Sequence, residues 1–143
     1  MKRLILLLML LSILTSCKKD DSNPVTADSG LIGTWVLTSV SGSTSQGPVT
    51  ITPAQANMSM TIVFNSNKTC ELTVVTNGQP TNETDTWSTS NGKVTFNSNG
   101  TSYVLPYTLT GSKADIDFSS LITSINSTGG VTVTSLIFEF TKQ

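Results

Sequence analysis

The side chains that could do chemistry in this chain are few, and they exclude whole classes of reaction. The 143 residues include no histidine, so a Ser-His-Asp site or a histidine-based metal centre is excluded. Asp115 and Asp117 stand two residues apart, and such a pair could act as general acid and base or hold calcium. No third acidic residue is near them in sequence, so we interpret both, like Glu71, as part of a solvated strand face. We therefore expect no catalytic residue, metal site or cofactor, with catalysis by the aspartate pair as the alternative.

The two cysteines carry the remaining reactive chemistry, and the first lies in a processing signal. Lys2 and Arg3 precede an apolar run over residues 4–14, which is shorter than the roughly 20 residues that a transmembrane helix needs. This pattern is typical of a secretory signal peptide. The run ends in Leu-Thr-Ser-Cys, which resembles the lipobox of bacterial lipoproteins. The resemblance implies a lipoprotein signal peptide over residues 1–16 and palmitate-type lipidation of Cys17; a plain signal peptide with an incidental cysteine is the alternative.

The segment after Cys17 predicts where such an anchor holds the protein. Residues 18–21 read Lys-Lys-Asp-Asp and resemble the export signal of surface lipoproteins of the Bacteroidetes type. The resemblance implies attachment to the outer membrane through the lipid on Cys17, exposed on the cell surface. A periplasm-facing position is the alternative. Residues 17–30 are polar and are predicted to form the lipidated cysteine and a flexible tether.

Cys70 is then alone and cannot form an internal disulfide. It alternates in phase with Leu72 and Val74, so we expect it to point inward as a small, unreactive hydrophobe. A cysteine nucleophile would need an activating base, usually a histidine, which the chain lacks.

Composition limits the partners of the remaining chain. Beyond residue 16, six lysines oppose nine acidic residues and no arginine remains, so no basic footprint for nucleic acid exists. Residues 31–143 are enough for one core, and we expect a single domain and a monomer. Serine and threonine supply 44 residues, which suits strand faces and turns.

Apolar alternation and turn signals recur along residues 31–143 and predict an all-β fold. Asn91-Gly92 is the strongest hairpin signal, since both residues tolerate the positive φ of a type I′ turn. Thr52 and Pro53 suggest one short helical turn over residues 52–57, and residues 41–48 suggest a loop. We expect eight or nine strands, including residues 31–40, 49–51, 58–64, 69–76, 83–89, 93–97 and 101–110.

The end of the chain changes phase. Val131 and Val133 share one strand face, whereas Phe138 and Phe140 share the other. The change requires a bulge near Thr134 or two separate strands. An antiparallel up-and-down meander of this length hides its edges most simply by closing into a barrel of about eight strands; a sandwich is the alternative.

A family resemblance rests on Gly33-Thr34-Trp35 at the start of the first strand. This Gly-x-Trp signature, together with the anchor and the meander, resembles the lipocalin-like domain lipoproteins of the Bacteroidetes type. The resemblance implies a lipocalin-like (calycin-type) β-barrel over residues 31–143. It also implies that Trp35 packs across the closed end and that Gly33 permits close backbone approach. The chain departs from the family in lacking a clear aspartate-containing turn motif downstream and a long helix after the last strand.

The interior of such a barrel is either filled or holds one small ligand. We expect the inward aromatic residues to be the candidate cavity lining, with inward hydroxyls at Thr84, Thr86 and Ser88 at a polar end; a filled core is the alternative. The candidate lining comprises Trp87, Phe96, Tyr103, Tyr107, Phe118 and Phe138.

The function expected from these observations is non-enzymatic. We expect a lipid-anchored, lipocalin-like outer-membrane protein whose candidate ligand is a small hydrophobic or amphipathic molecule, with residues 41–57 as a mobile lid. The alternative is a structural or interaction module of the cell envelope that docks a protein or glycan partner, recognisable by an exposed apolar patch on its outside.

Overall fold

The computed structural model describes residues 29–124 and 132–143, and nearly all of them lie in one antiparallel sheet. The predicted signal peptide, Cys17 and most of the tether lie outside the described residues. The elements are β1 (Gly33–Thr44), β2 (Gly47–Ile51), β3 (Met58–Phe64), β4 (Thr69–Thr76), β5 (Gln79–Ser90), β6 (Lys93–Ser98), β7 (Thr101–Thr110), β8 (Lys113–Asp117), the 3-10 helix η1 (Ser119–Ser124) and β9 (Val133–Lys142).

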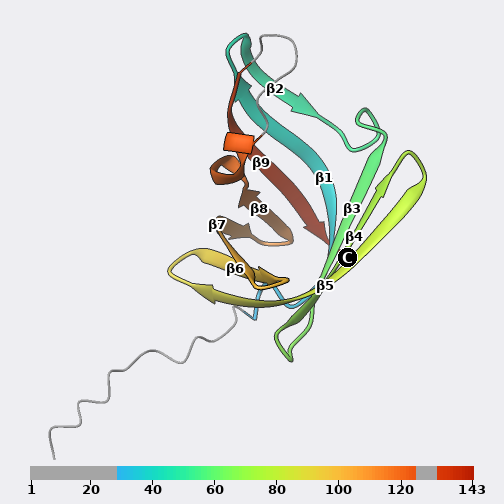
Figure 1. Ribbon diagram of the computed structural model, residues 1–143, viewed down its shortest axis with the longest axis vertical. Coiled ribbons are helices and arrows are strands. Elements are labelled where there is room, and N and C mark those ends of the chain that lie inside the picture. Colours follow the sequence, from blue (N-terminus) through green and yellow to red (C-terminus); the bar gives the residue numbers. More distant parts are fainter. Residues whose placement is uncertain (1–28, 125–131) are drawn as a thin grey trace, which may run out of the picture.

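The sheet closes on itself through β1 (Figure 1). Strands β3 to β9 follow one another in chain order, and β9 then pairs with β1 along most of its length. The result is an eight-stranded closed barrel with β2 as an additional strand on β1. The predicted all-β barrel is confirmed, and the sandwich alternative is wrong.

The first strand is longer than its sequence predicts. The sequence pattern predicts an end at residue 40, but β1 continues to Thr44 and forms a hairpin with β2. Ser41, for example, lies opposite Thr50 on one side and Ile137 on the other. The expectation of a loop at residues 41–48, and of a mobile lid at residues 41–57, is therefore wrong, because most of this backbone belongs to the sheet.

Residues 52–57 connect β2 to β3, and both strands pair with β1. The predicted helical turn forms as hydrogen-bonded turns without becoming a helix. The Thr52 backbone N–H donates to Gln55 Oε1 at 2.7 Å, and the Gln55 N–H donates to Thr52 Oγ1 at 3.4 Å. This reciprocal capping box fixes the turn, while the short helix of the fold is η1.

The predicted change of phase near the end of the chain is a bulge within one strand. Ser43 lies opposite Ser135 and Thr44 lies opposite Val133, so Thr134 is the extra residue of β9. A second shift, between Leu37 and Ser39, adds one residue to β1. Bulges of this kind increase the local twist and bend the strand, which a barrel wall requires.

One end of the barrel is closed by the signature residues of β1. The Trp35 indole is 1% exposed, and its Nε1–H donates to the Leu31 carbonyl at 2.7 Å. Lys142 Nζ lies 5.4 Å from the ring centroid and donates to the Gly30 carbonyl at 3.0 Å. Gly33 has a φ of +132°, and a Cβ there would lie 2.8 Å from Lys142 Cε.

The hydrophobic core next to these residues fills the closed half of the barrel. The Phe64 and Trp87 rings meet edge to face with centroids 4.8 Å apart, and Trp87 Nε1–H donates to the Asn65 carbonyl at 3.1 Å. The other fully buried large side chains close around them: Leu31, Leu105, Ile116 and Phe140.

We expect Trp35→Ala to lower the free energy of unfolding by about 3–5 kcal/mol, the range for deleting a large buried ring. The matched change Val104→Ala, at a side chain that is 49% exposed, should cost less than about 1 kcal/mol. Urea denaturation followed by circular dichroism measures both. Equal losses in the two variants would show that Trp35 does not close the barrel.

Candidate functional site

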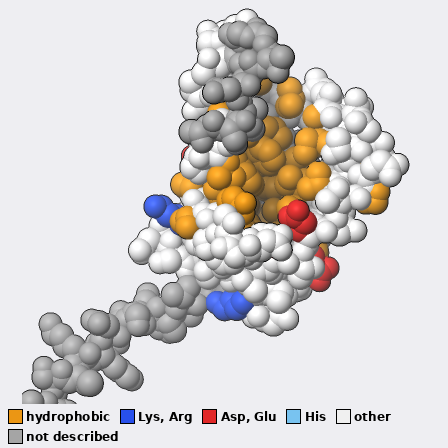
Figure 2. All heavy atoms as spheres, viewed as in Figure 1, with side chains coloured by type: hydrophobic (Ala, Val, Ile, Leu, Met, Phe, Trp, Pro, Cys, Tyr) orange, Lys and Arg blue, Asp and Glu red, His pale blue; other side chains and the backbone are white. Residues whose placement is uncertain are grey.

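The open half of the barrel contains a cavity of about 360 Å³. Figure 2 shows hydrophobic side chains gathered in a hollow, with an acidic side chain at its margin. Strands β3 to β7, the β6–β7 turn, Phe118 and η1 supply the walls. The nine apolar or weakly polar lining residues are Met60, Ile62, Cys70, Leu72, Phe96, Tyr103, Leu105, Phe118 and Leu121.

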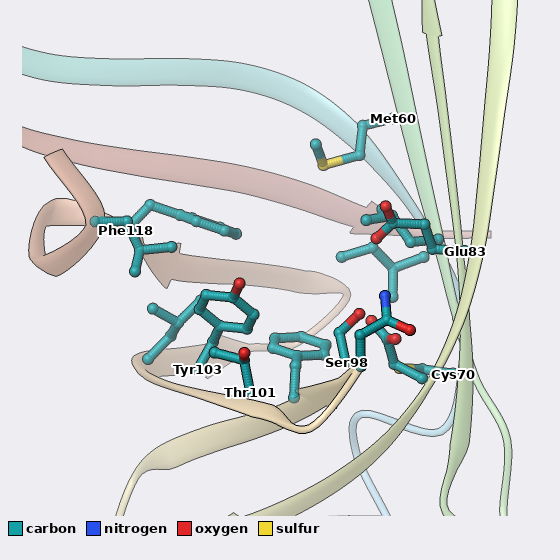
Figure 3. A pocket seen from close by; sticks show the side chains of 14 residues that line it. Met60, Cys70, Glu83, Ser98, Thr101, Tyr103 and Phe118 are labelled. Carbon is teal, nitrogen blue, oxygen red and sulfur yellow. The ribbon is translucent and has the colours of Figure 1, made fainter. Parts of the chain in front are cut away.

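The structure places the six candidate lining residues in two groups. Phe96, Tyr103 and Phe118 line the cavity, and Figure 3 shows Tyr103 and Phe118 facing Glu83 across it, with Met60 above. The other three lie outside the lining: Trp87, Tyr107 and Phe138.

Packing explains why those three side chains do not reach the cavity. Trp87 is 2% exposed and packs in the closed end against Phe64. Phe138 stands behind Phe118, with ring centroids 4.5 Å apart. Tyr107 packs against the core and lies two residues beyond Leu105, the last residue of β7 that lines the cavity. Alternation thus identified inward side chains but not their height in the barrel.

The polar lining differs from the prediction. Glu83 and Asp85 of β5 face the cavity, whereas Thr84 and Thr86 are exposed and Ser88 is not in the lining. The expectation of inward hydroxyls at these three positions is wrong. Trp87 carries the signal that was missed: it is inward, so the residues two and four before it must share its face.

Both carboxylates lie where β5 extends beyond its neighbour. Glu83 pairs in register with Leu72, and Asp85 with Cys70, on β4. The pairing of β5 with β6 reaches only Thr86, so the β4–β5 hairpin projects past the β6–β7 turn (Figure 1). The remaining polar lining comes from that turn and its flanks: Ser98, Asn99 and Thr101. The polar groups therefore gather on one side of an otherwise apolar cavity.

The Cys70 thiol forms part of the cavity wall and is 1% exposed. Burial raises its pKa from 9.0 to about 11, the negative charge of Asp85 adds to the rise, and a hydrogen bond with the Asp85 backbone partly offsets it. The thiol is therefore neutral near pH 7 and is a poor nucleophile.

The outward carboxylates lie outside the lining of this cavity. Asp115 is exposed, and Asp117 Oδ1 accepts a hydrogen bond from the Ser119 backbone N–H at 2.8 Å. Glu71 is also exposed. Within residues 29–124 and 132–143, no cluster of three potential metal-ligating side chains occurs, and no helix is long and apolar enough to cross a membrane.

A family model describing a lipocalin-like domain matches residues 31–113, more than half of the chain. This chain belongs to the lipocalin-like domain family. The match begins at Leu31 and ends at Lys113, and in the structure β9 then completes the lipocalin-like barrel by pairing with β1. Comparisons with curated proteins and with solved structures found no match.

We expect the free energy of unfolding to fall by roughly 2 kcal/mol between pH 9 and pH 11 because of Cys70. In this window the unfolded thiol ionises, whereas burial keeps the folded thiol protonated until its pKa of about 11. Denaturant melts across this range should show the fall, and Cys70→Ala should reduce it. If the free energy of unfolding fell equally with pH in the unmodified protein and in Cys70→Ala, the fall would not be due to Cys70, because the two proteins differ only in this side chain.

Proposed function

We propose that this lipocalin-like protein is non-enzymatic and takes up a small hydrophobic or amphipathic molecule in its open half, while a lipid on Cys17 holds it at the outer membrane. The observation that supports binding best is the cavity of about 360 Å³, in which nine of the fourteen lining residues are apolar or weakly polar. Small-molecule sites are concave, mostly apolar and carry a few polar groups, and this cavity matches that description.

The free energy gained by burying apolar surface favours an apolar ligand. Burying apolar surface contributes about 25 cal/mol per Å², and the walls present aliphatic and aromatic side chains at Ile62, Leu72 and Phe96. Met60 adds an unbranched, flexible side chain that can adjust to different shapes. A volume of 360 Å³ lies near the lower end of the usual range for ligand sites. The ligand is therefore small or leaves one end in solvent.

A docking role has less support. Five large hydrophobic residues among those described are at least 36% exposed. Tyr103 lines the cavity, and Val49 and Ile51 lie opposite Gly42 and Val40, on the inner face of the wall. Of these five, only Val104 and Ile137 face outward, on strands β7 and β9, with β8 between them. These two do not form the contiguous patch typical of a protein interface.

The same geometry argues against catalysis. A cysteine nucleophile requires a depressed pKa, and that of Cys70 is raised to about 11. The carboxylates Asp115 and Asp117 lie outside the cavity lining, so a molecule bound in the cavity would not contact them. Binding without turnover is therefore the function that we propose.

We expect Leu72→Trp to weaken the binding of decanol, a neutral apolar probe, at least tenfold, because the larger ring would occupy the cavity. Thr73→Trp, on the opposite face of the same strand, should leave the affinity within about twofold. Isothermal titration calorimetry on the purified protein measures both. Equal affinities in the two variants would show that decanol binds elsewhere.

We expect Cys17→Ser to abolish incorporation of an alkyne-tagged palmitate in a bacterial host and to shift the protein out of the membrane fraction. Cys70→Ser is the matched control and should retain label and fractionation. Replacing residues 18–21 by alanine should preserve the label but remove protease accessibility on intact cells. Labelling of the Cys17→Ser protein would contradict the proposed anchor, and unchanged protease accessibility would favour an export signal outside residues 18–21.

A further inference from the structure

The ionic character of the cavity is one-sided. Glu83 and Asp85 are the charged residues of its lining, and no lysine is among the lining residues. The two carboxylates occupy alternate positions of β5 and point to the same face, roughly 7 Å apart at Cα. Figure 3 shows the Glu83 carboxylate directed toward the open space between the walls. An incoming molecule would meet two negative charges beside an apolar interior.

Neither carboxylate is neutralised within the described part of the chain. The ion pair found there joins Lys113 to Glu139 on the outside of the barrel, at 3.2 Å. Lys68 and Lys142 lie near Trp87 and Trp35 at the closed end, away from the cavity. The two carboxylates therefore give the cavity a negative charge, with which a positively charged ligand group could pair.

The groups around these two carboxylates would stabilise a cation bound in the cavity. Asp85 is partly buried and Glu83 is exposed, so Asp85 interacts through a less polar medium and contributes more. The hydroxyls of Ser98 and Thr101 and the amide of Asn99 are on the same side and can accept hydrogen bonds from an N–H donor. Beyond them, the rings of Phe96 and Tyr103 offer π faces that attract cations.

We propose that the ligand is a cationic amphiphile: an apolar body held among Ile62, Leu72 and Leu105, and a protonated amine or quaternary ammonium held at Glu83 and Asp85. This inference rests on the proposed function and adds the charge of the ligand to it. The same carboxylates disfavour an anionic amphiphile such as a fatty acid, because its head group would be placed beside like charges.

Three probes of equal chain length test the proposal: decylammonium, decanol and decanoate, each titrated calorimetrically into the purified protein, the two ions below their micelle concentrations and decanol below its solubility limit. We expect decylammonium to bind at least tenfold more tightly than decanoate, with decanol between them. Added salt should reduce the difference, because it screens the attraction and the repulsion.

A pair of double variants assigns the preference to these residues. Glu83→Gln with Asp85→Asn should bring the affinities for decylammonium and decanoate to within about twofold and leave that for decanol unchanged. The control, Asp115→Asn with Asp117→Asn, makes the same change in net charge on the outer face of β8 and should keep the full preference. Circular dichroism verifies that each variant folds.

Each outcome decides between the two proposals. Equal binding of all three probes by the unmodified protein would overturn the cationic ligand and leave the cavity as a neutral apolar site. A preference that persists without both carboxylates would also overturn it. Binding of none of the probes would overturn the proposed function, and this inference with it.

Discussion

The pairing of β9 with β1 is the constraint on which the rest of this molecule depends. It joins the last strand to the first over registers from Trp35–Lys142 to Thr44–Val133, and it removes the two long edges that an open meander would expose. Closure also fixes which face of every strand points inward, because a slip of one residue would turn each side chain to the other face. The bulge at Thr134 lets one strand satisfy this register at both of its ends.

Closure leaves the two ends of the barrel with different contents. At one end, Leu31 and Trp35 near the start of the fold lie beside Lys142 at the end of β9. Contacts among these three residues close this end of the barrel. Large rings then fill the interior as far as Phe64 and Trp87. Beyond them the side chains line a cavity instead of filling the interior, and the wall is extended by the extra strand β2 and the projecting β4–β5 hairpin. The cavity is therefore the space that the core residues cannot fill.

The fold follows from local signals to a large extent, and the site does so only in part. Alternation and Asn-Gly turns predict the strands, and the positive φ angles of Asn91 and Gly92 agree with the expected turn. The full length of β1 is hidden, because Ser41 and Gly42 look like loop residues until β2 and β9 pair with them. Alternation also gives no height along the barrel axis, so it cannot separate Trp87 in the core from Phe96 at the cavity.

The carboxylates of β5 show how one feature can serve both fold and ligand. Residues 79–85 have β4 on one side and lie beyond the reach of β6, so they form an edge that another strand could join. Charged side chains at an edge discourage such pairing, which is a sufficient reason for charge at Glu83 and Asp85. Protection of the edge does not explain why these charges are negative, because lysine protects an edge equally well. Two negative charges beside an apolar cavity without a basic residue are explained more fully when the molecule that enters the cavity carries the opposite charge.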